Sequence, residues 1–204
     1  MFAPLISQIQ QDFQPFQEEV IQLIDSMPIM LAKAQRSRRA KVAPEIASIG
    51  YNATKKTYYY GVKLHGLAFR QIGHLPLPNY LGLTGAHEAD ITVLKAFSKE
   101  IQGTPVYADK AYTDASLACS LEQQQAPLYT PVKKQKGQIT LTLFQIAFST
   151  LVSQVRQPIE SLFNWIQEKT NIQLASKVRS FHGLMVHVFG RLAAAMLLLP
   201  NFKS

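Results

Sequence analysis

Two short apolar runs each end at an aspartate, and this pattern constrains the fold more than any other feature of the sequence. The runs are Ile21–Ile24, followed by Asp25, and Pro105–Ala108, followed by Asp109. Runs this short are typical of buried strands rather than helices. In open α/β sheets, ligands gather beyond the carboxyl ends of the strands. The pattern therefore predicts two strands that present carboxylates at one edge of a sheet.

Two further strands are predicted between these runs. Thr57–Phe69 alternates as a tyrosine-rich strand, with Lys63 and His65 on one face and the apolar Val62 and Leu64 on the other. Ile72–Thr84 is predicted to return beside it as an edge or bulged strand, because it contains two prolines.

Helical patterns dominate the rest of the chain. Asp90 is expected to cap a helix over Ile91–Ile101, and Asp114 a second one over Ala115–Gln125. A strand is expected over Ala126–Val132. Helices follow from Leu143 onward, with a break near Asn171. The order β, β, β, α, β, α, β and then helices predicts an α/β fold with a mixed sheet and helices on both faces.

No internal repeat divides the chain. Residues 1–20 are predicted to form an N-terminal helical segment, since apolar residues such as Leu5, Ile9 and Phe13 recur at roughly helical spacing. Residues 21–204 are predicted to form a single domain, with the later helices at its end.

The chain carries an excess of positive charge, with 21 Lys and Arg against 13 Asp and Glu and a net charge of +8. This balance favours an anionic partner, either nucleic acid or an acidic membrane surface. Three basic clusters lie between apolar segments, where they form either DNA contacts or solvated loops, and we favour DNA. Their residues are Lys33, Arg36, Arg38, Arg39 and Lys41; Lys55 and Lys56; and Lys133, Lys134 and Lys136.

Membrane and secretory classes are disfavoured. The N-terminus lacks a basic region followed by an apolar one, as a signal peptide would have. Gly183–Leu199 is strongly apolar but contains Arg191, so we expect a buried helix and no membrane partner. The lone Cys119, expected to be buried in a helix, excludes a disulfide framework and suits a reducing cytoplasm.

A third carboxylate, Glu160, lies in the later helical region with Arg156 one turn before it. Asp25, Asp109 and Glu160 together would suit Mg²⁺, which prefers oxygen ligands. Each also has a simpler explanation, because Asp25 could start a turn, Asp109 could pair with Lys110, and Glu160 could form a surface pair with Arg156.

Four segments in order give the chain a resemblance to a known family. They are YYYGVKLHG at Tyr58–Gly66, LTGAHEAD at Leu83–Asp90, VYADKAYTD at Val106–Asp114 and VRQPIESLFNWIQEK at Val155–Lys169. Together they resemble the DDE transposases of bacterial insertion sequences. VYADKAYTD matches the strand and turn around that family's second catalytic aspartate, and VRQPIESLFNWIQEK matches the helix with its glutamate.

The resemblance implies an RNase H-like fold, in which a five-stranded mixed sheet flanked by helices carries a D, D, E triad. In this chain the triad falls on Asp25, Asp109 and Glu160, which would bind two Mg²⁺ or Mn²⁺ ions. The implied activity is phosphodiester hydrolysis followed by strand transfer. Arg156 would orient Glu160 or contact phosphate. The implied partners are transposon-end and target DNA and further copies of the chain, as a dimer or higher oligomer, in the bacterial cytoplasm at the nucleoid.

The chain departs from the family pattern around the glutamate, where Ser153 and Gln167 replace the usual Tyr and Lys. It also begins only 24 residues before Asp25, so we expect part of an interrupted frame or a remnant without the N-terminal DNA-binding region. Two alternatives to a transposase stay open: a truncated, inactive copy that binds DNA, and a related nuclease. Lys63 and His65 either approach the scissile phosphate or form a sheet-face pair.

Overall fold

A computed structural model describes residues 20–53, 55–134 and 136–199 of the chain. The predicted segment 1–20 therefore lies, except for its last residue, outside the described residues. The described elements follow one another as β1 (Gln22–Lys33), α2 (Ala34–Ser37), β2 (Ser48–Asn52), β3 (Thr57–Phe69), β4 (Leu77–Gly85), α3 (Asp90–Phe97), η1 (Ser98–Glu100), β5 (Val106–Tyr107), η2 (Lys110–Tyr112), α4 (Ala115–Gln123), β6 (Leu128–Tyr129), α5 (Leu143–Thr170) and α6 (Phe181–Leu198).

The longest pairing in the sheet joins β1 and β3 in antiparallel register, with Asp25 opposite Gly66 and Pro28 opposite Lys63. The expectation that the first strand ends at Asp25 is therefore wrong, because β1 continues to Lys33. The alternation of buried Met27, Ile29 and Leu31 extends the strand along β3, and it outweighs the turn signal of Pro28. Asp25 thus lies within a long strand.

The described residues form a six-stranded mixed sheet in the order β2-β3-β1-β5-β6, and β4 pairs with β3 as well. The expected count of five strands is wrong, because the described sheet contains one more strand. The additional strand is β2, a short strand that pairs with the beginning of β3. The strand over Thr57–Phe69 is confirmed. The pairing of β5 with β1 is parallel and involves only Gln22 and Leu23 of β1, so β1 leaves β5 just before Asp25.

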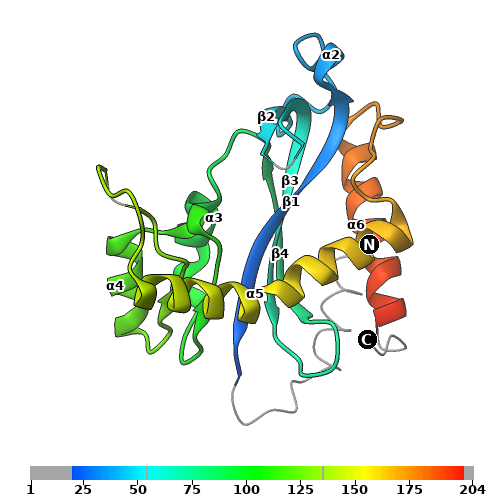
Figure 1. The fold of residues 1–204 in the computed structure, drawn as a ribbon. Helices are drawn as coiled ribbons and strands as arrows, with labels where there is room; N and C mark the ends of the chain where they lie inside the picture. Colours follow the sequence, from blue (N-terminus) through cyan, green and yellow to red (C-terminus); the bar gives the residue numbers. More distant parts are fainter. Residues whose placement is uncertain (1–19, 54, 135, 200–204) are drawn as a thin grey trace.

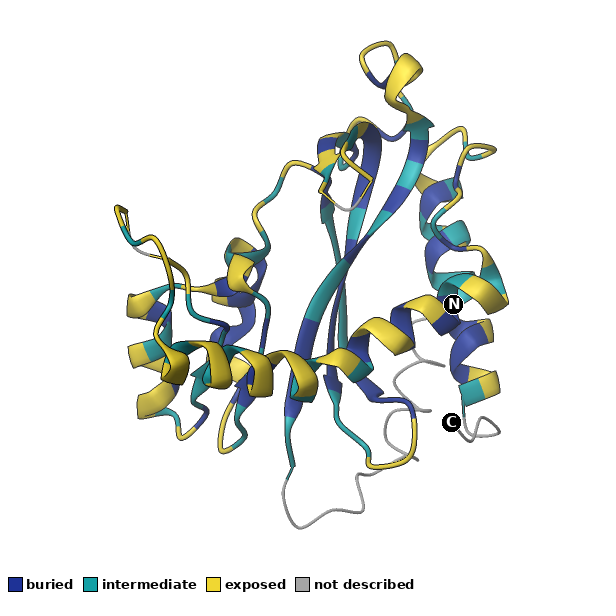
Figure 2. Ribbon diagram, in the orientation of Figure 1, coloured by how far each residue is buried: buried dark blue, intermediate teal, exposed yellow. Residues whose placement is uncertain are grey.

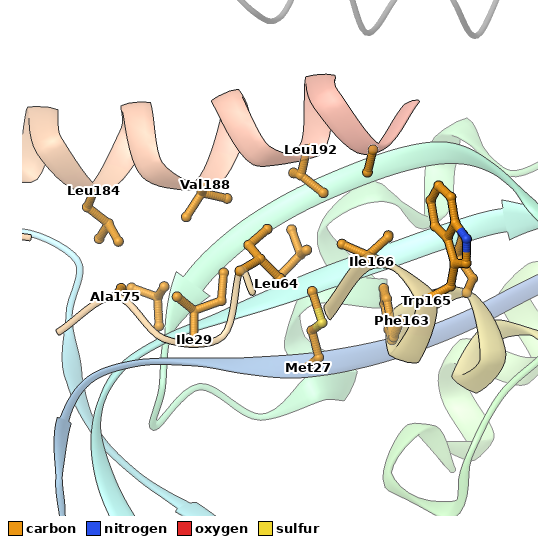
Figure 3. Close-up of a cluster of buried hydrophobic side chains, with 14 of the residues drawn as sticks. Met27, Ile29, Leu64, Phe163, Trp165, Ile166, Ala175, Leu184, Val188 and Leu192 are labelled. Carbon is orange, nitrogen blue, oxygen red and sulfur yellow. The ribbon is translucent and has the colours of Figure 1, made fainter. Parts of the chain in front are cut away.

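Helices cover both faces of the sheet, as predicted (Figure 1). Leu23 and Met27 of β1 face α5 and α6, whereas Ile24, between them in sequence, faces α3 and α4. Figure 2 shows the buried residues concentrated along the strands and along the sides of the helices that face them. In Figure 3, Leu184, Val188 and Leu192 of α6 point toward the strands. Phe163 and Trp165 of α5 belong to this core.

Local capping signals set several helix ends. The Asp114 side chain accepts a hydrogen bond from the Leu117 N–H and confirms the predicted cap of α4. Asn171 ends α5 in the left-handed conformation, at φ 54°, where the break was expected. The cap predicted at Asp90 is wrong, because Ala89 precedes the helix without a side-chain cap and Asp90 is its first residue. The carboxylate of Asp90 instead accepts hydrogen bonds from side chains of β1 and β3.

Two predictions about the helices have different outcomes. Cys119 is exposed rather than buried, because the buried side of α4 carries Leu117 and Leu121 and a residue midway between them points outward. The apolar C-terminal segment does form a helix, α6, packed on the sheet. By length and composition α6 could also span a membrane, and it is the single such helix among the described residues.

Candidate active site

Asp25, Arg156 and Glu160 meet where α5 crosses the first half of β1. One Arg156 nitrogen donates to Asp25 Oδ2 at 2.8 Å, and the other donates to Glu160 Oε1. Asp25 and Arg156 are 131 residues apart in sequence. The close approach of α5 to the sheet depends on Gly66, opposite Asp25, because a Cβ there would lie 3.0 Å from Cζ of Phe163. The fold therefore brings two of the three predicted carboxylates to one guanidinium.

Asp109 is held at the entry to η2. Its Oδ1 accepts a hydrogen bond from the Lys110 N–H at 2.6 Å, which fixes the turn after β5. Its charge acts on both Asp25 and Arg156 and contributes to the pKa shifts of both groups. The third predicted carboxylate thus belongs to the same electrostatic cluster, although no direct hydrogen bond links it to the other two.

Burial dominates the electrostatics of Asp25. Desolvation raises the pKa of its carboxyl from 3.8 to about 6, although Arg156 and the Ser26 N–H both lower it. The negative charges of Glu160 and Asp109 raise the pKa of Asp25 further. The Arg156 guanidinium therefore offsets only part of the cost of burying this carboxylate.

A groove of about 520 Å³ runs beside the cluster along α5. Arg156, Gln157 and Glu160 line it from the helix, Lys110 from the turn after Asp109, and Pro131 from the loop that follows β6. Figure 2 shows the first half of α5 exposed over most of its surface. The open side of the carboxylate cluster therefore faces a solvent-filled groove with basic groups in its wall.

The chain resembles one family of known proteins. A family model described as a transposase DDE domain matches residues 16–180. The chain belongs to this family. Searches of curated proteins and of solved structures gave no match. The predicted resemblance is therefore confirmed at the level of the family, and the matched residues include Asp25, Asp109 and Glu160.

Transposase DDE domains generally depend on divalent metal ions. The donor chemistry fits, because the three groups are carboxylates and their oxygens are ligands that Mg²⁺ prefers. In the present arrangement the Arg156 guanidinium lies between Asp25 and Glu160, and no three His, Cys, Asp or Glu side chains of the described part form a group that could hold a metal ion.

The predicted DNA-binding residues separate into two regions. The exposed Arg36, Arg38, Arg39 and Lys41 surround α2, and Lys55 and Lys56 lie in the turn between β2 and β3 at the same end of the sheet. The exposed Lys133, Lys134 and Lys136 lie in the loop between β6 and α5, which borders the groove. Lys134 donates to the Ile139 carbonyl within that loop.

Lys63 and His65 lie on the other face of the sheet from Asp25. Lys63 Nζ donates to Asp90 Oδ1 at 2.8 Å and also to the Glu88 carbonyl. His65 Nε2 lies 2.8 Å from Thr84 Oγ1. Both side chains therefore have protein partners on the sheet face, which favours the sheet-face interpretation over a phosphate contact.

The departures around Glu160 also have a structural place. Ser153 lines the groove. Gln167 instead binds the turn after α5: its Nε2 donates to Asn171 Oδ1 and its Oε1 accepts from the Gln173 N–H. The sequence analysis missed Lys110 as a groove residue. Its position directly after Asp109 was the available signal, since the fold places that turn against α5.

Proposed function

We propose that this chain is an insertion-sequence transposase domain that cuts and rejoins DNA through Asp25, Asp109 and Glu160. These carboxylates would hold Mg²⁺ or Mn²⁺, two ions in all, and the metal would activate the attacking oxygen and stabilise the leaving one. Arg156 would move from the carboxylates to a DNA phosphate as the ligands take up metal, and Lys110 would contact the same strand in the groove.

One observation carries this proposal: Arg156 links Asp25 of β1 to Glu160 of α5 beside the groove, within the charge field of Asp109. A surface pair between Arg156 and Glu160 alone would need no third carboxylate. Burying Asp25 beside two other carboxylates raises its pKa, which is costly for a protein without a use for it. Family membership supports the same reading.

The experiment is Mn²⁺- or Mg²⁺-dependent nicking of supercoiled plasmid by the full chain. We expect Asp109→Ala to reduce nicking at least 100-fold, because a lost ligand removes transition-state stabilisation. Glu168→Ala is the matched control, since it removes an exposed carboxylate two turns further along α5. Strand transfer of a pre-cleaved end separates a transposase from a nuclease that only cuts. Nicking that persists in Asp109→Ala would contradict the proposal.

A second candidate is a copy that binds DNA without catalysis. The position of Arg156 between Asp25 and Glu160 favours it, because no three-ligand metal group forms in the described region with the guanidinium there. Salt-sensitive DNA binding without nicking in either metal would support this alternative.

A further inference from the structure

Behind Asp25, on the opposite face of the sheet, side chains of β1 and β3 converge on one carboxylate of α3. Asp90 Oδ1, at the start of α3, accepts hydrogen bonds from Lys63 Nζ of β3 at 2.8 Å and from Ser26 Oγ of β1 at 3.1 Å. His65 of β3 approaches the same oxygen at 3.9 Å and contacts Thr84 of β4. Asp90 therefore joins α3 to the strand that carries Asp25.

The contact reaches Asp25 through a single residue. The Ser26 N–H donates to Asp25 Oδ1 at 2.8 Å, while the hydroxyl of the same serine donates to Asp90. Successive residues of a strand point to opposite faces, so Ser26 lies between the two carboxylates. Any shift of Ser26 changes the donor that orients Asp25.

The same helix also holds the turn that carries Asp109. Tyr112 of η2 is 1% exposed and packs in the core beneath α3, in a cluster with Leu94 and Phe97. Its buried hydroxyl has no hydrogen-bond partner among the residues that the structure describes, and it lies within the electrostatic fields of Asp90, Asp25 and Asp109. Lys95 of α3 pairs with Asp114, just beyond η2. The helix α3 thus contacts both segments that supply the first two carboxylates.

We propose that Asp90 is a positioning residue, which acts through Ser26 and α3 to fix Asp25 relative to Asp109. This inference rests on the proposed function, since it concerns the geometry of the same site. Where β1 leaves β5, no strand pairing continues between Asp25 and the turn at Asp109. The bridge from Ser26 through Asp90 and α3 to Tyr112 replaces that pairing.

The test compares Asp90→Asn, Ser26→Ala and the double variant in the full chain. We expect each single variant to lower kcat for Mn²⁺-dependent nicking about 10-fold with an unchanged KM for DNA. The double variant should also lose about 10-fold rather than about 100-fold, because both changes interrupt one path. Mn²⁺ binding, measured by electron paramagnetic resonance of the free ion, should weaken severalfold in all three.

Ser37→Ala is the matched control, since it removes a buried hydroxyl that donates to the Ala34 carbonyl far from the site. It should leave kcat and Mn²⁺ binding unchanged. Urea unfolding of every variant identifies losses that follow from instability, and Ser26→Ala provides a mild change if Asp90→Asn does not fold.

The outcomes separate the two proposals. Wild-type kcat in Ser26→Ala and Asp90→Asn, with nicking abolished in Asp109→Ala, would overturn the positioning role and leave the proposed function intact. Fully additive losses would overturn the path through Ser26. If the wild type neither nicks DNA nor binds Mn²⁺ through Asp25, the proposed function fails and the positioning role fails with it.

Discussion

Arg156 shows how much of the site depends on one side chain. Its guanidinium is mostly buried and contacts two carboxylates, and its charge is the strongest influence that lowers the pKa of Asp25. Burial nevertheless outweighs that influence, so the pKa of Asp25 is about 6. Burying the charged form of Asp25 is therefore unfavourable, and a bound cation would stabilise that form. Such unfavourable electrostatics are typical of functional sites.

His65 gives a prediction about stability and pH. Burial lowers its pKa from 6.5 to about 4, Asp90 of α3 opposes this shift and Lys63 of β3 adds to it. Because the unfolded chain binds a proton more readily between pH 6.5 and pH 4, the free energy of unfolding falls as the pH drops through that range. The expected loss is about 2 to 3 kcal/mol.

Urea unfolding of wild type and His65→Gln at pH 7 and pH 4.5 measures this contribution. Glutamine can still contact Thr84 but does not titrate, so the variant should lose less stability on acidification. His74→Gln, at an exposed loop position, should behave as the wild type does. Equal acid sensitivity of wild type and His65→Gln would refute the prediction.

Contacts between residues that are close in sequence could be predicted from the sequence. The Arg156–Glu160 pair follows from a spacing of four residues on a helix. The bond from Arg156 to Asp25 joins residues 131 positions apart, and spacing alone carries no information about it. The roles of the three carboxylates came from resemblance, and they stay predictions. The local sequence predicts a helix cap at Asp90, because its tertiary partners Ser26 and Lys63 are distant in sequence.

At the scale of elements, the contact between α5 and β3 sets the geometry of the site. Gly66 lies opposite Asp25, and the ring of Phe163 occupies the space that a larger residue would need. Glu160 lies one turn before Phe163 on the same helix. A methyl group at Gly66 would push α5 outward by a few tenths of an ångström and move Glu160 with it.

Gly66→Ala should therefore slow nicking while lowering the free energy of unfolding only modestly. We expect about 10-fold slower nicking, since small displacements of catalytic groups are costly, and about 1 kcal/mol lower free energy of unfolding. Gly103→Ala is the control, because the left-handed φ of 63° there makes alanine costly by a similar amount without a steric contact within 4 Å. Nicking at the wild-type rate in Gly66→Ala would show that α5 tolerates the displacement.

The elements that were predicted correctly depend on local signals. The cap at Asp114, the break at Asn171 and the alternation of β3 are all set within a few residues. The length of β1 and the presence of β2 depend on pairing with β3, which supplies a template longer than either prediction assumed. The local sequence allows a turn to start at Asp25, because it contains no information about the long partner strand.

At the scale of the whole molecule, the basic clusters predicted to bind DNA lie in two places. The lysines of the loop before α5 follow Pro131, which lines the groove, whereas Arg38 and Arg39 follow α2 at the far end of β1. Asp25 and Lys33 are eight residues apart on β1, which corresponds to roughly 26 Å. A duplex that contacts both places must therefore extend about 8 base pairs beyond the cleavage point.

This layout predicts a dependence on DNA length. The double variant Arg38→Gln/Arg39→Gln should weaken binding to a 20-base-pair duplex and reduce the slope of log Kd against log salt concentration by about 2, because two phosphate contacts are lost. With a hairpin whose stem has about 6 base pairs, the variant should bind as the wild type does, since that DNA cannot reach α2 from the groove. Lys133→Gln/Lys134→Gln is the matched control and should weaken both complexes. Fluorescence anisotropy over a salt series measures the affinities of the wild type and both variants for the two DNAs. An equal loss for the short hairpin in the Arg38→Gln/Arg39→Gln variant would place the DNA on a different path from the one along β1.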